Sequence, residues 1–139
     1  MKYVNFPPYV ELFWLEDINV VQLKWTGLYL SLDKFKEVAN AAKKMLSVHN
    51  SSIWIADQYD SKGAFNKEVL DYIANELVED VVANYEVKLV LTIMPKDKGI
   101  SSLSAKRWVG DVQEMGVFKM ATFPTIEACK KWIIEDDNK

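Results

Sequence analysis

The strongest structural signal in the chain is the segment Val87-Lys88-Leu89-Val90-Leu91-Thr92-Ile93-Met94. It is nearly continuously apolar and rich in β-branched residues, which is typical of a strand that is covered on both faces. Strands of this kind belong to parallel sheets with helices packed against them. Pro95 follows directly and cannot continue the hydrogen bonding of a central strand. The segment therefore predicts a central strand in a helix-covered sheet.

Outward from this strand, strand patterns and helix patterns alternate along the chain. Apolar residues recur at helical spacing after each of the candidate caps Ser31, Asn66 and Ser104, and again over residues 125–134. The sequence also predicts strands at residues 9–15, 20–25, 52–57 and 117–123. Strands that alternate with helices in this way favour parallel pairing through right-handed crossovers.

The opening of the chain departs from that alternation. Residues 9–15 and 20–25 are joined by a turn too short for a crossover helix, so they are expected to form an antiparallel hairpin. The predicted fold class is therefore α/β, with a single mixed sheet of about five strands, parallel in its later part, and about four helices. Residues 1–139 are expected to form one domain. Its first segment, 1–8, is predicted to be an extended leader that ends at two prolines, and 135–139 a tail frayed by acidic residues at the wrong end of the helix dipole.

Composition excludes several classes of function. The 139 residues carry 17 basic and 20 acidic side chains, a net charge of −3, so the chain has no general attraction for nucleic acid. With one cysteine and one histidine it forms neither a disulfide framework nor a Cys/His zinc site by itself, and we expect no metal and no cofactor. The sequence shows no signal peptide and no apolar run long enough for a membrane span, so a cytoplasmic location is expected.

Polar residues follow two of the predicted parallel strands. Asp57, Asp60 and Ser61 come after the third predicted strand, and Lys96 comes after the fourth. Ligands of open α/β sheets bind at these carboxyl ends, so the four residues are candidates for contact with a phosphate, a small polar ligand or a partner. Loops at this edge are polar in most proteins in any case. An enzyme built on Asp57, Asp60 and Lys96 would need these groups to converge on one point. The sequence shows no catalytic motif, and the chain is predicted not to be an enzyme.

Other chemically distinctive residues have structural explanations. His49 lies at a helix exit, where a cation suits the helix dipole, and Cys129 lies on an apolar helical face and is expected to be buried. Phe13, Trp14 and Trp25 belong to the opening hairpin, which is a candidate for the edge of the sheet. Aromatic residues at a sheet edge can face a partner, so a homodimer is expected.

Three segments of the sequence point to a known family. A predicted strand ends in Trp25-Thr26-Gly27, another reads Ser52-Ile53-Trp54-Ile55-Ala56-Asp57, and the terminal stretch from Thr122 to Ile133 carries Phe123, Ala128 and Trp132. Together with the order of elements over residues 9–134, these segments resemble the bacterial SpoIIAA-like family. That family is grouped with STAS domains and with the CRAL-TRIO lipid-exchange fold. The resemblance implies a small non-enzymatic module that regulates or binds another protein, frequently as a homodimer.

The resemblance also implies a site of modification. In one branch of the family an Asp-Ser-Ser-Gly motif follows the corresponding strand, and its first serine is phosphorylated to control partner binding. Asp60-Ser61-Lys62-Gly63 matches three of the four positions, so Ser61 is the phosphorylation candidate, although Lys62 departs from the motif. The alternative function is a module that binds a small apolar or lipid-like ligand between its sheet and its helices.

Overall fold

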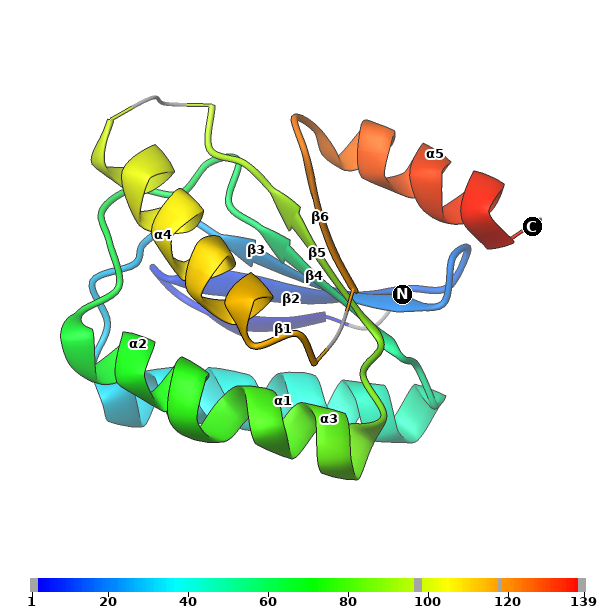
Figure 1. Cartoon of the computed structure of the whole chain (residues 1–139), viewed down its shortest axis with the longest axis horizontal. Helices are drawn as coiled ribbons and strands as arrows, with labels where there is room; N and C mark the ends of the chain where they lie inside the picture. The colour runs from blue at the N-terminus through cyan, green and yellow to red at the C-terminus, as the bar shows by residue number, and fades with distance from the viewer. Residues whose placement is uncertain (1–2, 97–98, 118, 138–139) are drawn as a thin grey trace.

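The computed structural model describes residues 3–96, 99–117 and 119–137 (Figure 1). Over these ranges six strands form one sheet, and their order in the sheet is their order in the chain. They are β1 (Tyr3–Phe6), β2 (Val10–Leu15), β3 (Val20–Trp25), β4 (Ile53–Asp57), β5 (Leu89–Ile93) and β6 (Lys119–Phe123). The first three strands pair antiparallel, and β3 to β6 pair parallel. The predicted α/β class and mixed sheet are confirmed.

Four helical segments connect and cover the strands within the described ranges. They are α1 (Leu32–His49), a continuous run of α2 (Lys67–Tyr72), η1 (Ile73–Leu77) and α3 (Val78–Tyr85), then α4 (Ile100–Glu114) and α5 (Ile126–Asp137). The first three segments pack on one face of the sheet and α5 packs on the other. In Figure 1, α5 lies above the strands while α1 and α3 lie below them. The result is a three-layer arrangement with an apolar core on each side of the sheet.

Side-chain caps fix where the first two helices begin. The Ser31 hydroxyl accepts a hydrogen bond from the Lys34 backbone N–H at 3.1 Å, and Oδ1 of Asn66 accepts one from the Val69 N–H at 2.9 Å. Each bond satisfies a backbone donor that has no partner inside its helix. Asn50 ends α1 in the left-handed conformation with φ of 54°. The predicted starts of α1 and α2 are therefore confirmed.

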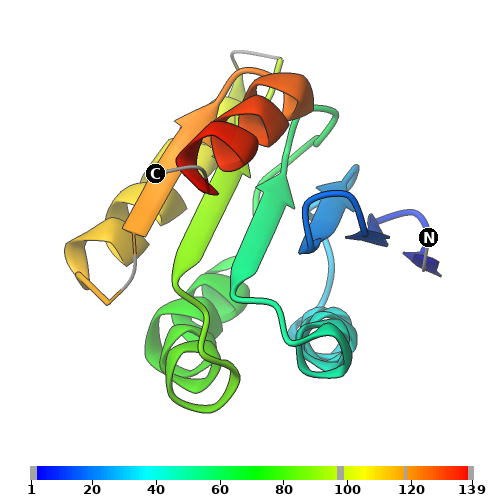
Figure 2. The same ribbon diagram turned by 90° about the vertical axis from the view of Figure 1, so that its right-hand side faces the viewer.

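The sheet has one strand more than expected because the predicted leader forms β1. Asn5 of β1 lies opposite Glu11 of β2, so the hairpin of β2 and β3 is not at the edge, and Figure 2 shows β1 and β6 at opposite edges. Trp14 and Trp25 are each only 3% exposed and belong to the core on the α1 side. The prediction that these two tryptophans face a partner is wrong, because β1 covers the hairpin and both side chains pack inward. Residues 1–2 of the predicted leader lie outside the described part of the chain.

The last two helices differ from prediction in their limits. α4 begins at Ile100, after Gly99, and not after the predicted cap Ser104. α5 continues to Asp137, so the acidic segment expected to fray is helical up to that residue, while 138–139 lie outside the described residues. None of the described helices combines the length and the apolar character needed to cross a membrane.

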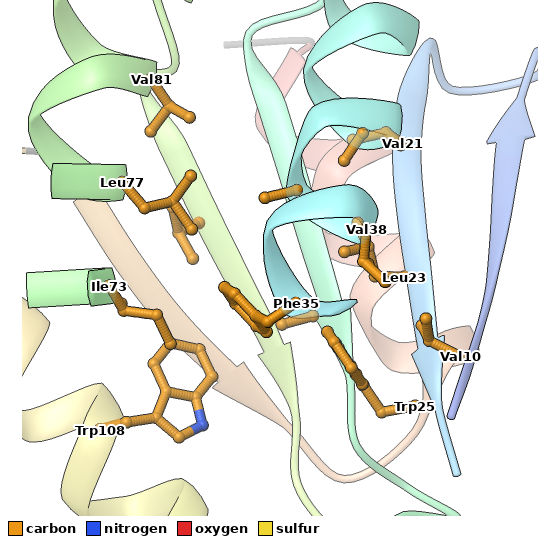
Figure 3. Packing of buried hydrophobic residues seen from close by; sticks show 14 of the residues in the cluster. Val10, Val21, Leu23, Trp25, Phe35, Val38, Ile73, Leu77, Val81 and Trp108 are labelled. Carbon is orange, nitrogen blue, oxygen red and sulfur yellow. The ribbon is translucent and has the colours of Figure 1, made fainter. Parts of the chain in front are cut away.

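The larger of the two cores lies between the sheet and α1, α3 and α4. Figure 3 shows Leu23 and Trp25 of the sheet facing Phe35 of α1, with Ile73 and Trp108 reaching in from the other helices. The smaller core lies beneath α5 and contains Cys129, which is fully buried as predicted. Burial raises the pKa of the Cys129 thiol to about 12, so the group stays protonated and unreactive.

Candidate functional site

Two of the four predicted polar residues, Asp57 and Asp60, line a cleft at the carboxyl ends of β3 and β4 and the start of α5. This polar cleft has a volume of about 250 Å³ and is lined by Lys24, Asp57, Tyr59, Asp60, Thr125, Ile126 and Glu127. Asp57 and Asp60 therefore share one site. Lys96 joins them indirectly, because its Nζ lies 2.9 Å from Oδ1 of Asp60.

Asp57 is held in place by its own neighbours. Its Oδ2 accepts a hydrogen bond from Nε2 of Gln22 at 2.9 Å, and its Oδ1 accepts one from the Tyr59 backbone N–H at 3.0 Å. Burial raises the pKa of Asp57 above its ordinary value of 3.8, and the two hydrogen bonds oppose that rise. Both carboxylate oxygens are engaged by the protein, which is the arrangement of a carboxylate that fixes a strand end and its loop.

Asp60 is more exposed and lies between two lysines. Lys96 donates to it at 2.9 Å, and Nζ of Lys24 lies 4.0 Å from its other oxygen. The hydrogen bond from Lys96 lowers the pKa of Asp60 below 3.8. Asp57 thus bonds to Gln22 while Asp60 bonds to Lys96, so the three groups of the enzyme hypothesis lie at or beside the polar cleft and each is engaged by another residue of the protein. Among the residues that the structure describes, no cluster of histidine, cysteine and acidic side chains is placed to hold a metal ion.

Ser61, the predicted phosphorylation site, lies inside the turn that follows β4. Its hydroxyl donates to the backbone carbonyl of Gln58 at 2.8 Å and lies 3.3 Å from Oε1 of the Gln58 side chain. Ser61 is 3% exposed. Access for a kinase therefore requires this turn to open, and phosphorylation of Ser61 stays a prediction.

A second, apolar cavity lies between the sheet and the helices that cover its other face. It has a volume of about 70 Å³ and is open to solvent. Its walls are aliphatic and aromatic except for one amide, and they consist of Leu23, Trp25, Phe35, Trp54, Ala56, Gln58, Phe65, Ile73, Leu77, Val78, Val81, Val87, Val90, Trp108 and Val112. The alternative function places an apolar ligand between the sheet and its helices, but the sequence does not predict which residues line the cavity.

One wall of the apolar cavity is an irregular helical turn. The Val78 N–H bonds to the carbonyl of Ile73, five residues back, so η1 is a π-helical turn between α2 and α3. Ile73, Leu77 and Val78 all line the cavity. A π-turn inserts one extra residue into the helix and is frequently found at functional sites. Apolar periodicity marks this segment as helical but does not distinguish a π-turn from an α-helix.

The two sites lie on opposite faces of the sheet and meet at consecutive residues. Asp57 lines the polar cleft beside α5, and Gln58 lines the apolar cavity beneath α4. The Gln58 backbone N–H bonds to the Ile93 carbonyl at 2.9 Å, which ties this turn to the neighbouring strand. His49 lies apart from both sites and stacks on Trp14 with ring centroids 4.0 Å apart, in agreement with a structural role.

Comparisons of this chain with family models, with curated proteins and with solved structures find no match.

The raised pKa of Asp57 gives a test of its environment. A carboxyl group whose pKa is higher in the folded state stabilises the fold below its unfolded pKa of 3.8, and that contribution is lost as pH rises through the folded value. Asp57→Asn carries no charge at any pH and keeps an acceptor for Tyr59. Urea unfolding between about pH 4 and pH 7 should show the wild type losing stability relative to this variant as pH rises.

Asp60→Asn is the control, and we expect its stability relative to the wild type to change with pH in the opposite direction. Lys96 holds the pKa of Asp60 below its ordinary value, so this variant should lose stability relative to the wild type at neutral pH and not in acid. Identical pH profiles for the wild type and Asp57→Asn would show that burial does not perturb Asp57.

Proposed function

We propose that this protein binds a small apolar molecule in the apolar cavity and performs no catalysis. The observation that carries the proposal is a cavity of about 70 Å³ within the larger core, open to solvent and walled almost wholly by aliphatic and aromatic side chains. Protein interiors are packed as closely as organic crystals, and voids larger than a water molecule are few. Concave, largely apolar sites with a small number of polar groups are typical of small-molecule binding.

The size of the apolar cavity limits its occupant. An apolar cavity of roughly 150 Å³ holds benzene, and this one is about half as large. The ligand is therefore a molecule of few heavy atoms, or one that extends through the opening. The π-turn supports the proposal, because Ile73, Leu77 and Val78 at its two ends all line the cavity and turns of this kind are frequently found at functional sites.

Filling the apolar cavity from its floor should abolish binding. Ala56 is 4% exposed, lies on β4 and lines the cavity, so Ala56→Leu places a larger side chain in the space the ligand needs. We expect methylenecyclopentane, a small hydrocarbon probe, to shift the methyl signals of Ile73, Leu77 and Val81 saturably in NMR spectra of the wild type. The same titration of Ala56→Leu should leave these signals unchanged.

Ala42→Leu is the matched control for this experiment. Ala42 is fully buried on α1 and does not line the apolar cavity, so the same substitution strains the core without occupying the site. This variant should still bind the probe. The proposal fails if the wild type shows no saturable shifts, or if Ala56→Leu binds as tightly as the wild type.

A regulatory, protein-interaction function of the STAS-like kind is the second candidate. The observation that favours it is Tyr29, which is 70% exposed and lies against Gly63 in the loop that carries Ser61. Tyrosine is enriched in protein interfaces. Phosphorylation of Ser61, a homodimer and a cytoplasmic location belong to this candidate. If Tyr29→Ala no longer binds a protein partner while its apolar cavity is intact, that result would favour the protein-interaction function over the binding of a small apolar molecule.

A further inference from the structure

Two polar groups in the wall of the apolar cavity are left without partners. Nε2 of Gln58 and Nε1 of Trp108 are both buried, and neither finds a hydrogen-bond partner within the described ranges. A buried donor without a partner has lost its hydrogen bond to water and gained none in return, which lowers stability. Native proteins rarely leave such groups unpaired, and two of them in one cavity indicate that an occupant of the cavity supplies what is missing.

The structure fixes how these two groups face the cavity. Gln58 is fully buried, its backbone is tied to Ile93, and one end of its amide lies 3.3 Å from the Ser61 hydroxyl, so the other end is left for the cavity. Trp108 reaches in from α4, and Figure 3 shows its ring extending toward Ile73 with the indole nitrogen on the side of Phe35 and Trp25.

The chemistry of these groups defines the polar part of the ligand. An indole N–H donates and never accepts, so the partner of Trp108 is an acceptor. The unpaired end of the Gln58 amide is Nε2, which also donates, so its partner is an acceptor as well. The Thr92 hydroxyl, beside Ala56 in the strand register, is also unpaired among the described residues, but Thr92 is not among the residues that line the apolar cavity.

The ligand's acceptor is uncharged. None of the described residues that line the apolar cavity carries a charge. A carboxylate or phosphate placed there would be buried without a counter-ion, which is far more costly than burying a neutral oxygen. A carbonyl oxygen satisfies an indole N–H without that penalty.

From these observations we infer that the ligand is a small, uncharged, apolar molecule with a carbonyl oxygen, which accepts a hydrogen bond from Nε1 of Trp108 while Gln58 supplies the second polar contact. The inference rests on the proposed function, since it names the class of molecule that the apolar cavity binds. It separates polar recognition at one end of the site from apolar packing over the remaining wall.

A pair of isosteric probes tests the inference. Cyclopentanone and methylenecyclopentane differ only in the exchange of a carbonyl oxygen for a CH₂ group. We expect the wild type to bind the ketone about tenfold more tightly, the effect of one net hydrogen bond. The ketone should also move the indole N–H proton signal of Trp108 downfield, and the hydrocarbon should not.

Variants assign the effect to the two residues. Trp108→Phe keeps an aromatic ring but removes the donor, so it should bind both probes with about equal affinity; it also identifies the Trp108 indole signal. Gln58→Met should reduce the preference for the ketone as well. Trp132→Phe is the matched control, because Trp132 packs against Phe123 on the α5 side of the sheet, and it should keep the full preference.

The outcomes distinguish this inference from the proposed function. Equal binding of the two probes by the wild type overturns the inference and leaves the proposed function standing, with water as the partner of Trp108. Binding of neither probe overturns the proposed function itself. A ketone preference that persists in Trp108→Phe overturns the assignment to Trp108. Because the probe ratio and the indole shift are measured on the wild type, the inference stays testable if a variant fails to fold.

Discussion

Replacing Phe35 by alanine is expected to lower the free energy of unfolding by about 3–5 kcal/mol. Phe35 is 4% exposed, and its ring centroid lies 5.8 Å from that of Trp25, 5.4 Å from that of Phe65 and 6.0 Å from that of Tyr72. The substitution removes these contacts and leaves a void that joins the apolar cavity, because Phe35 forms part of the wall. Urea unfolding at neutral pH measures the change.

Phe123→Ala is the control for the loss of a phenyl ring. Phe123 is half-buried on the α5 side, where its ring lies 5.6 Å from that of Trp132, so we expect a loss of only about 1–2 kcal/mol. Toluene should then raise the melting temperature of Phe35→Ala more than that of the wild type, because it refills the void. Equal losses in the two variants would show that Phe35 is not closely packed.

Gly63→Ala is expected to destabilise the fold by about 2–3 kcal/mol. Gly63 has a φ of +90°, in the left-handed region that side chains avoid, and a Cβ added there would lie 2.3 Å from Cε2 of Tyr29. The loop cannot easily move away, because Lys62 is hydrogen-bonded to the backbone of Thr26 and Leu28 at 3.1 Å on each side. Tyr29 is mostly exposed, so its ring can swing aside at modest cost. Thermal and urea unfolding measure the total destabilisation caused by Gly63→Ala.

Gly116→Ala separates the backbone cost of a side chain at positive φ from the steric cost of the contact with Tyr29. Gly116 also has a positive φ, +66°, but among the described residues a Cβ there would meet no atom within 4 Å, so this variant should lose only the backbone contribution of about 1–2 kcal/mol. Adding Tyr29→Ala to Gly63→Ala should recover the remainder in a double-mutant cycle. The contact with Tyr29 is disproved if Gly63→Ala costs no more than Gly116→Ala and the cycle shows no coupling.

The parts of the fold that local patterns determine were predictable from the sequence. The apolar run around β5, the helical spacing after Ser31 and the cap at Asn66 all depend on neighbours in the chain, and each is confirmed. β1 was missed because a short segment before two prolines carries a weak strand signal, and its pairing with β2 is visible only in the folded molecule. For the same reason the edge position assigned to Trp14 was wrong.

The candidate sites also differ in how far the sequence predicts them. Asp57 and Asp60 could be placed together because carboxyl ends of parallel strands meet at one edge of a sheet. The apolar cavity could not be predicted, because an apolar position looks the same in sequence whether the core around it is filled or hollow. Gln58 follows the predicted strand 52–57 and Trp108 lies in the predicted helix after Ser104, and only the folded arrangement brings the two to one cavity.

Because Asp57 and Gln58 are adjacent and line sites on opposite sides of the sheet, a molecule bound beside Gln58 is well placed to alter the environment of Asp57. If a molecule in contact with Gln58 shifts the turn that also carries Asp57, the affinity of that molecule changes with the protonation of Asp57. Reciprocity then requires the bound molecule to change the proton affinity of Asp57 by the same factor. Asp57 and Gln58, adjacent at the end of β4, would thereby couple protonation on one face of the sheet to ligand binding on the other.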